Sequence, residues 1–198
     1  IVFGSSLETI GNQCFARCTS LPSLSLPDTV TSLGNQCFYG SENLCSVSIG
    51  TGLESMGQYA FAKCTALKSV EFRPCDTGKL IISEGAFRWC SELEEVAFSD
   101  AIKSFRPDAF NSCSALKRVV ISDSVTGISG GAFTYCTSLG ELILGDGLTG
   151  IGGYSGSYVD TDSNNDYEQY GAFAGCVNLT NIVFGSSLET IGNQCFAR

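Results

Sequence analysis

The fold is decided by a stretch such as residues 116–139, LKRVVISDSVTGISGGAFTYCTSL. Its first six residues are expected to alternate between inward and outward positions, with Leu116, Val119 and Ile121 as apolar members and β-branched side chains among them, which predicts a strand. After a turn come an apolar pair, Val125 and Ile128, and then Ala132 and Phe133. The small Ala allows close backbone approach, and the Phe fills the centre of the unit. Because so small a unit cannot bury its own apolar face, it needs similar units on both sides.

The same unit recurs along the chain, and we call each copy a rung. A step of 23 residues separates Leu21 from Leu44 and Leu44 from Leu67, and the same step recurs from Leu93 through Leu116 to Leu139. Each rung has one central Phe: Phe15, Phe38, Phe61, Phe87, Phe110, Phe133, Phe173 and Phe196. Stacking superimposes like side chains, with rungs about 4.8 Å apart. The sequence therefore predicts a repeat solenoid, a β-rich leucine-rich-repeat superhelix with a parallel sheet, in preference to a compact β domain with accidental periodicity.

Two rungs are longer than the others. The rung that starts at Leu67 has three extra residues around Arg73–Ile81, and the rung that starts at Leu139 has seventeen, at 154–170. Gly, Ser, Asp, Asn and Tyr dominate the second insert, which predicts a loop outside the stack.

A second and longer period is also present. Residues 182–198, IVFGSSLETIGNQCFAR, repeat residues 1–17 letter for letter, whereas other rungs agree only at their apolar columns. The identity marks a super-repeat of 181 residues, or seven rungs. We interpret residues 1–198 as a single leucine-rich-repeat solenoid segment from a tandem array or continuous fibre, because neither end carries the polar cap of a finite solenoid. A recent duplication within a finite protein and an artificial overlap are the alternatives.

The composition argues against several classes of protein. The chain is 43% hydrophobic and 16% charged, which is too apolar for a disordered protein. Its net charge of −9 argues against nucleic acid as a partner, and no apolar run reaches the roughly 20 residues of a membrane helix. The lack of His removes Ser-His-Asp and Cys-His catalysis. We therefore expect no enzyme, no insertion into a membrane and no cofactor, calcium excepted.

The rungs resemble the BspA-like leucine-rich repeats of bacterial and protist surface proteins. The motif I-G-x-x-A-F-x-x-C-x-x-L carries the resemblance, for example at 128–139 and, with Met56 in the Ile position, at 56–67. It covers nearly the whole chain apart from the two inserts. Departures are Cys14, Cys37 and Cys195 in the Ala column and Ser41 in the Cys column. The resemblance implies a non-enzymatic surface or adhesive role and an extracellular or cell-surface location.

Most of the eleven cysteines follow the repeat. One column consists of Cys18, Cys64, Cys90, Cys113, Cys136 and Cys176. This spacing does not form C-x-x-C pairs, which argues against zinc and favours a buried ladder of thiols. The candidate disulfide is Cys14–Cys37, the only adjacent pair in the Ala column. Neighbouring rungs bring Cα atoms within about 4.4–6.8 Å, although parallel side-chain vectors oppose a bond.

The long insert contains a candidate calcium loop. Hard oxygen ligands alternate at Asp160, Asp162, Asn164 and Asp166, as in calcium-binding loops. Two features weaken the match, because Asn165 occupies the usual Gly position and Gly171 the position of a bidentate Glu. A solvated acidic loop and a contact loop between solenoid turns are the alternatives. Four Tyr of the insert are contact candidates, since Tyr offers large area at low entropic cost: Tyr154, Tyr158, Tyr167 and Tyr170.

Two further surface features are candidates. The outward column of the predicted strands ends in an apolar stripe, Val120, Ile143 and Val183, which indicates either a partner contact or simple strand propensity. Asn178 begins an N-glycosylation sequon, Asn-Leu-Thr, which functions only in a secreted eukaryotic context.

These observations lead to two functional hypotheses. The first is a structural protein, the building block of an extracellular fibre or tandem-repeat array that self-associates by end-to-end continuation of the solenoid. The second is a surface adhesin or binding module for a protein or glycan partner.

Overall fold

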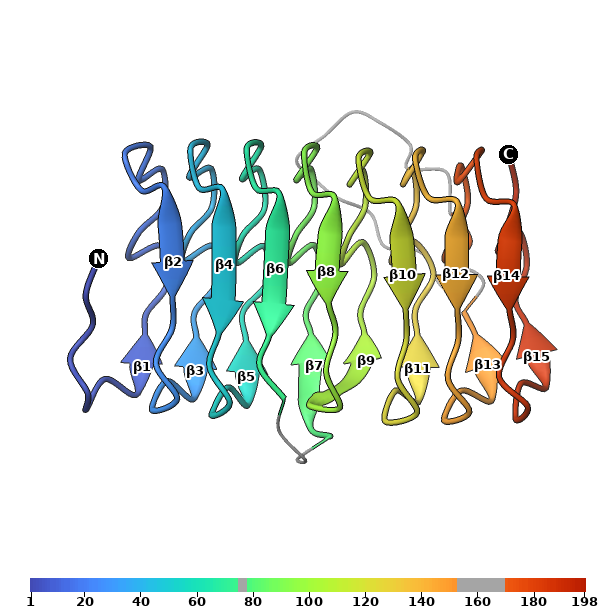
Figure 1. Cartoon of the computed structure of the whole chain (residues 1–198), viewed down its shortest axis with the longest axis horizontal. Helices are drawn as coiled ribbons and strands as arrows, with labels where there is room; N and C mark the ends of the chain where they lie inside the picture. The colour runs from blue at the N-terminus through green and yellow to red at the C-terminus, as the bar shows by residue number, and fades with distance from the viewer. Residues whose placement is uncertain (75–77, 153–169) are drawn as a thin grey trace.

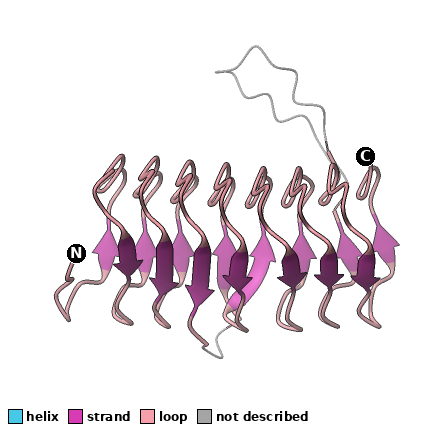
Figure 2. Cartoon of the chain, turned by 45° about the horizontal axis from the view of Figure 1, so that its top comes forward, coloured by secondary structure: helices cyan, strands magenta, loops and turns pink. Residues whose placement is uncertain are grey.

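The computed structural model describes residues 1–74, 78–152 and 170–198. Within these ranges the chain is a solenoid of short parallel strands and turns, without a helix (Figure 1). A typical rung contributes one strand to each of two facing layers, whose strands run in opposite directions (Figure 2). The predicted β-rich solenoid with parallel sheet pairing is confirmed.

One layer is a sheet that continues along the whole solenoid. Its strands pair in the order β1 (Thr9–Ile10), β3 (Ser32–Leu33), β5 (Ser55–Met56), β7 (Leu80–Ile82), β9 (Ile102–Phe105), β11 (Gly127–Ile128), β13 (Gly150–Ile151) and β15 (Thr190–Ile191). The sequence did not predict this sheet, because most of these strands have only two residues. A two-residue strand contributes a single inward side chain, so no apolar alternation marks it.

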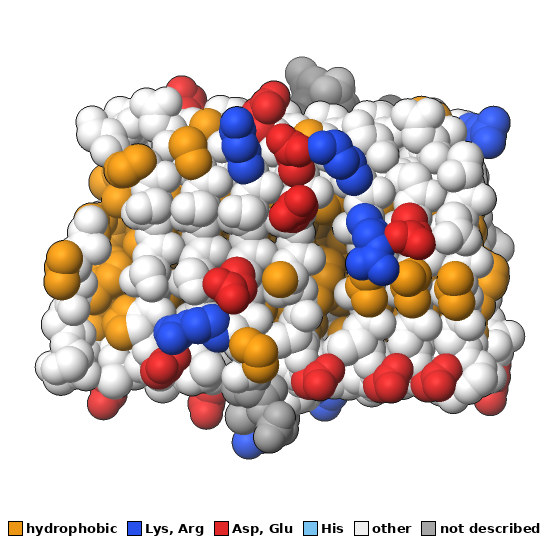
Figure 3. Space-filling model, in the orientation of Figure 1, with side chains coloured by type: hydrophobic (Ala, Val, Ile, Leu, Met, Phe, Trp, Pro, Cys, Tyr) orange, Lys and Arg blue, Asp and Glu red, His pale blue; other side chains and the backbone are white. Residues whose placement is uncertain are grey.

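The other layer contains the strands that the sequence predicted, but it is divided into two sheets. The first is β2 (Ser23–Ser25), β4 (Ser46–Ile49), β6 (Ser69–Phe72) and β8 (Glu95–Ala97); the second is β10 (Arg118–Val120), β12 (Glu141–Ile143) and β14 (Asn181–Val183). Phe98 directly follows β8 at this break and packs edge-on against Phe105 at 5.2 Å and Phe110 at 5.5 Å. Apolar side chains are visible in the gap between β8 and β10 (Figure 3).

The strand register follows the length of each rung. Ser23 pairs with Ser46, and Ser46 pairs with Ser69, at steps of 23 residues. The step becomes 26 from Ser69 to Glu95 and 40 from Glu141 to Asn181. The extra residues therefore lie between paired strands and leave the two shorter sheets in register, whereas in the continuous sheet the pairing of β7 with β9 shifts between Leu80 and Ile81.

The core is one cluster that runs through the solenoid, and its centre is a stack of Phe rings. Consecutive rings from Phe15 to Phe196 lie 4.9–5.5 Å apart with interplanar angles of 10° or less. The Phe rings from Phe38 to Phe173 are fully buried. Stacking of rungs thus buries what no single rung could bury.

The Cys column has a polar role that the sequence did not reveal. From Cys64 to Cys176, each thiol of the column donates to the carbonyl of the central Phe in the preceding rung, as from Cys113 to Phe87 and from Cys136 to Phe110, both at 3.3 Å. Ser41 occupies the same column, and its hydroxyl donates to the Phe15 carbonyl at 3.1 Å. A small side chain with a hydrogen-bond donor is what this column requires.

The rungs centred on Phe15 to Phe133 also bend through left-handed backbone at two positions, two residues before and two residues after the Phe, and the last two rungs do so at one of them. Side chains larger than Gly adopt positive φ at many of these positions: Gln13, Arg17, Gln36, Tyr59, Lys63, Trp89, Asp108, Ser112, Tyr135 and Gln194. Each such residue costs about 1–2 kcal/mol relative to right-handed backbone. The strain persists because neighbouring rungs fix the backbone through hydrogen bonds, such as Trp89 N to Asn111 O at 2.9 Å.

Candidate interaction surfaces

The turns of successive rungs are joined by polar side chains at equivalent positions. The Asn12 amide oxygen accepts from Asn35 N at 2.8 Å, and the Asn35 amide oxygen accepts from Gln58 N at 2.9 Å. In the second half of the chain, the Asp123 carboxylate accepts from Asp146 N at 2.8 Å. Sequence reasoning missed these residues, although the recurrence of Asn in one column and of Asp in another was a usable signal. They fix the register between neighbouring rungs.

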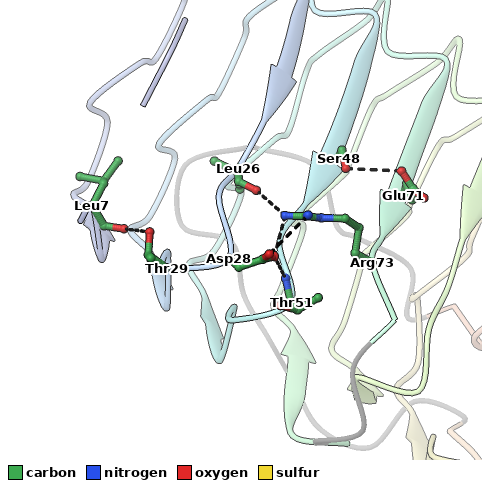
Figure 4. Close-up of polar contacts among 8 residues, drawn as sticks. All are labelled: Leu7, Leu26, Asp28, Thr29, Ser48, Thr51, Glu71 and Arg73. Atoms are coloured by element: carbon green, nitrogen blue, oxygen red, sulfur yellow. Dashed lines mark hydrogen bonds and ion pairs between the residues drawn. The ribbon is translucent and has the colours of Figure 1, made fainter. Parts of the chain in front are cut away.

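Arg73 lies next to the first insert and contacts residues two rungs earlier in the solenoid. Its guanidinium lies 2.6 Å from the Asp28 carboxylate and donates to the Leu26 carbonyl at 3.1 Å (Figure 4). The hydrogen bond from Thr51 N is the main reason why the pKa of Asp28 is lowered, and the charge of Arg73 lowers this pKa further. Because the Arg73–Asp28 ion pair is solvent-exposed, it fixes the relative position of the rungs more than it raises the free energy of unfolding.

The outer face of the two shorter sheets changes character along the solenoid. Its first half presents polar side chains, including Ser48 and Glu71, which contact one another at 3.4 Å (Figure 4). Its second half presents the predicted stripe: Val120 is 37% exposed, Ile143 is half-buried and Val183 is 48% exposed (Figure 3). The Arg118–Glu141 ion pair lies on the strands of this stripe. The contact role of the stripe stays a prediction.

A group of aromatic and basic side chains follows the turns after Phe38, Phe61 and Phe87. The Lys63 ammonium lies 5.6 Å from the ring centre of Tyr39 and 5.0 Å from that of Trp89. The Arg88 guanidinium covers Trp89 at 4.1 Å and pairs with Asp108 at 3.3 Å. These cationic and aromatic side chains contact one another within the chain, so they stabilise this edge of the solenoid.

The thiols of the core are protected by burial. Desolvation raises the pKa of Cys64 to about 12 and that of Cys176 to about 12, and it raises the pKa of Cys113 well above its usual value. The candidate pair, Cys14 and Cys37, consists of free thiols in the structure, Cys14 exposed and Cys37 buried. Their disulfide stays a prediction.

The other sequence candidates are placed as follows. Asn178 is exposed, and its side-chain nitrogen donates to the Thr137 carbonyl at 2.9 Å. Tyr170 contacts Tyr135 edge-on at 5.1 Å. The other insert candidates lie outside the described residues: Tyr154, Tyr158, Asp160, Asp162, Asn164, Asp166 and Tyr167. In the described part of the chain, no three Cys, Asp or Glu side chains gather as a metal site.

The two copies of the seventeen-residue sequence adopt the same conformation from their first Phe onward, whereas Ile182 and Val183 belong to β14 and their equivalents, Ile1 and Val2, lie outside any strand. Phe3 meets Phe15 edge-on at 6.0 Å and 83°, and the equivalent rings, Phe184 and Phe196, meet at 6.3 Å and 82°. The backbone φ is 57° at Gln13 and 55° at its equivalent, Gln194. The strands β1 and β15 occupy equivalent positions within the two copies. The outer side of residues 182–198 therefore carries the same groups, in the same arrangement, that residues 1–17 present to the next rung.

These features define a leucine-rich-repeat solenoid. The family model of the BspA type Leucine rich repeat region matches in six copies, over residues 1–78, 75–163 and 159–198. The chain belongs to this family, which confirms the resemblance inferred from the repeat motif. Comparison with curated proteins gives no match.

Solved structures agree with this assignment. A leucine-rich repeat protein from Bacteroides ovatus is 28% identical, with a TM-score of 0.75 over 96% of this chain and 47% of its own. The chain thus spans about half the length of that protein. A leucine-rich repeat protein of T. pallidum shares the fold at 22% identity, with a TM-score of 0.58 over 96% of this chain and 72% of its own. None of the described segments forms a helix of the length and hydropathy needed to cross a bilayer.

Proposed function

We propose that the chain is a non-enzymatic structural unit of an extracellular or cell-surface fibre or array, in which 181-residue blocks continue one solenoid end to end. The observation that carries the proposal is the equivalence of residues 1–17 and 182–198 in sequence and, from Phe3 and Phe184 onward, in conformation. Residues 18–40 pack on the first copy, so a rung of the same sequence can make the same contacts on the second copy, and its equivalent of β2 would in addition pair with β14. The surface location rests on the family.

Cohesion along such a fibre comes from three periodic contacts. The Phe stack supplies apolar burial, at about 2–3 kcal/mol per fully buried ring. Parallel strand pairing joins the backbones, and the Cys and Asn columns add hydrogen bonds between rungs. All three repeat with the rung, so they continue across a block boundary as they do within a block.

The test compares covalent chains of one, two and three 181-residue blocks by small-angle X-ray scattering. A continuous solenoid lengthens by roughly 35 Å per seven-rung block at constant cross-section. The matched control replaces Gly34 with Val at the block junction only, because a Cβ there meets Gly11 C and Asn12 N of the preceding rung at 2.5 Å. Blocks that bend independently in both the parent and the control chains contradict the proposal. Electron microscopy of the native material distinguishes filaments from discrete particles.

The second candidate function is adhesion, favoured by the exposed stripe of Val120, Ile143 and Val183. Such a stripe on a sheet face suits a protein or glycan partner. Binding of the chain to cells and glycan arrays would be compared with that of a Val120→Ser, Val183→Ser variant. Equal binding by both proteins argues against the stripe as the adhesive surface.

A further inference from the structure

We propose that the solenoid contains a hinge between β8 and β10, where the rungs on the two sides move relative to each other. We call the contact between two successive rungs a join, and the layer that contains β8 and β10 the divided layer. The hinge opens and narrows the gap in the divided layer and pivots on the continuous sheet. It is a property of the single chain and does not depend on the proposed fibre.

At this join only one of the two layers is paired. β8 and β10 belong to different sheets, whereas β9 and β11 pair, Phe105 with Ile128. At the joins on either side both layers pair, as β6 does with β8 and β10 with β12. A bend that opens the divided layer elsewhere must break backbone hydrogen bonds between strands, and here β8 and β10 have none to break. The resistance to bending is therefore lower at this join than at its neighbours.

The backbone is already stretched where the chain enters the two strands. The equivalent hydrogen bond measures 2.8 Å from Lys68 N to Cys45 O and 3.0 Å from Gly140 N to Lys117 O, but 3.4 Å from Lys117 N to Glu94 O. The last of these bonds crosses the join between β8 and β10. The Lys117 and Glu94 side chains also form an ion pair across it, which is solvent-exposed and resists movement only weakly.

The amide of Phe98, directly after β8, has lost its acceptor. Its equivalents donate across their own joins, Ile121 N to Ile143 O at 2.8 Å and Leu26 N to Ser48 O at 2.9 Å. Among the described residues, no group accepts from Phe98 N. Because a backbone N–H without a protein partner is normally hydrated, this amide reports whether water enters the gap.

The core is partly uncovered at the same place. Val96 and Phe98 belong to the inward columns but are only half-buried. Their equivalents in the two flanking rungs are at most 3% exposed: Val70, Phe72, Val119 and Ile121. The apolar side chains in the gap are visible from outside (Figure 3). The gap therefore opens into the core, and its width sets how far solvent reaches Phe98.

An overfilled rung explains why the divided layer opens here. Phe98 and Phe105 lie beside the central Phe110, at positions where the next rung has the smaller Ile121 and Ile128. Phe98 meets Phe105 at 5.2 Å and Phe110 at 5.5 Å, both edge-on. Additional ring volume in a packed core displaces the backbone around it. The three rings of this rung thus hold β8 away from β10.

The turn after these strands also lacks the glycine that close approach requires. A Cβ at Gly50 would meet Pro27 O at 2.5 Å, and a Cβ at Gly145 would meet Ser122 C at 2.5 Å. At the hinge this column holds Ser122, which follows Ser99 by one rung and has a Cβ. The two turns therefore cannot approach as closely as those at Gly50 and Gly145.

Amide hydrogen exchange of the whole chain, resolved by residue with NMR, tests the hinge. Phe98 N is expected to exchange at least about a hundredfold faster than Ile121 N, which donates at the next join. Phe98→Ile gives this rung the residue of the next one and is expected to close the gap, which slows exchange at residue 98 to within about tenfold of that at Ile121. Phe72→Ile is the matched control, because it makes the same change in the same column at a join where both layers pair. It is expected to leave the exchange of Phe98 N fast.

A distance measurement reports the movement itself. Spin labels on unnatural amino acids, which spare the native thiols, are placed at Glu71 and Ile143, three joins apart with the hinge between them. Ser25 and Ala97 lie in the same outward column, also three joins apart, and enclose only paired joins. Electron paramagnetic resonance is expected to give a distance distribution at least about twice as wide for the first pair as for the second. Phe98→Ile is expected to make the two widths equal.

Three results overturn the hinge. They are protection of Phe98 N equal to that of Ile121 N, equal distance widths for the two label pairs in the parent chain, and a folded Phe98→Ile chain in which residue 98 still exchanges as fast as in the parent. If Phe98→Ile does not fold, the first two comparisons decide, since both use the parent sequence at the hinge.

Discussion

Replacement of Phe110 by Ala tests the core directly. This ring is fully buried and lies 4.9 Å from Phe87 and 5.2 Å from Phe133, stacked on both. It also meets Phe98 edge-on at 5.5 Å. Truncation removes ring contacts on both sides of the rung at once.

The expected cost is about 3–5 kcal/mol, near the upper end for a large buried side chain, because the cavity cannot collapse easily. The backbone on either side is fixed by hydrogen bonds, such as Phe110 N to Ala132 O at 2.7 Å. Phe196→Ala is the matched control. Phe196 is half-buried and, among the described residues, stacks on Phe173 alone, at 5.5 Å, with an edge-on contact to Phe184 at 6.3 Å, so its truncation is expected to cost about 1–2 kcal/mol.

Urea unfolding followed by circular dichroism measures both costs, and the fluorescence of Trp89, the only Trp, reports on the neighbouring Phe87 rung. Because solenoid rungs couple only to their neighbours, the Phe110 variant is also expected to unfold less cooperatively, with a lower m-value. A Phe110→Ala chain that loses less than about 1 kcal/mol refutes the assignment of this ring to the core. Equal costs for Phe110→Ala and Phe196→Ala refute the role of double-sided stacking.

Three other outcomes follow from burial and close packing. Under reducing conditions, exposed Cys14 and Cys45 are expected to react with iodoacetamide in the native chain, whereas buried Cys113 reacts only after unfolding. Mass spectrometry of the labelled peptides measures this difference. Loss of Cys14 reactivity without reductant would support the Cys14–Cys37 disulfide. The free energy of unfolding is expected to be retained below pH 9 and to fall between pH 9 and about 12. In the unfolded chain the thiols lose their protons near pH 9, whereas in the folded chain Cys64 and Cys176 stay protonated to about pH 12. Each of these two thiols lowers the free energy of unfolding by up to about 1.4 kcal/mol per pH unit in this range. Urea midpoints at pH 8, 9.5 and 10.5 measure this fall, and a Cys64→Ser, Cys176→Ser variant should show a shallower one. Gly147→Ala is expected to destabilise by at least about 1–3 kcal/mol, since its Cβ meets the Asp123 carbonyl oxygen at 1.9 Å, and an unchanged melting temperature would contradict that packing.

Most of the core could be predicted from the sequence. The Phe column and the inward Leu and Val positions recur at a fixed step. Apolar side chains that recur with the period of a repeat indicate buried positions, and the structure buries them. The Cys column was predicted to be buried, and its residues from Cys64 to Cys176 are. Their hydrogen bonds to Phe carbonyls were not predicted, because they depend on how one rung is laterally placed over the next.

The continuous sheet and the division of the other layer into two sheets could not be predicted either. A strand such as Gly127–Ile128 is defined by its pairing with Ile102–Phe105 and Gly150–Ile151, and not by any pattern of its own. Similarly, Arg73 reaches Asp28 across 45 positions of sequence, a distance at which no local signal operates. Pairing partners and ion pairs of this kind are set by the superposition of rungs.

The sequence by itself determined the period, the apolar columns and the identity of residues 1–17 with residues 182–198, because side-chain chemistry alone carries that information. It also determined the conformation of this segment from Phe3 and Phe184 onward, which is the same in both copies. Only the tertiary structure decided which side of each copy is covered. Ile10 and Ile191 have the same chemistry and the same neighbours in sequence, yet one is buried and the other half exposed, because burial is a property of the adjoining rung and not of the residue.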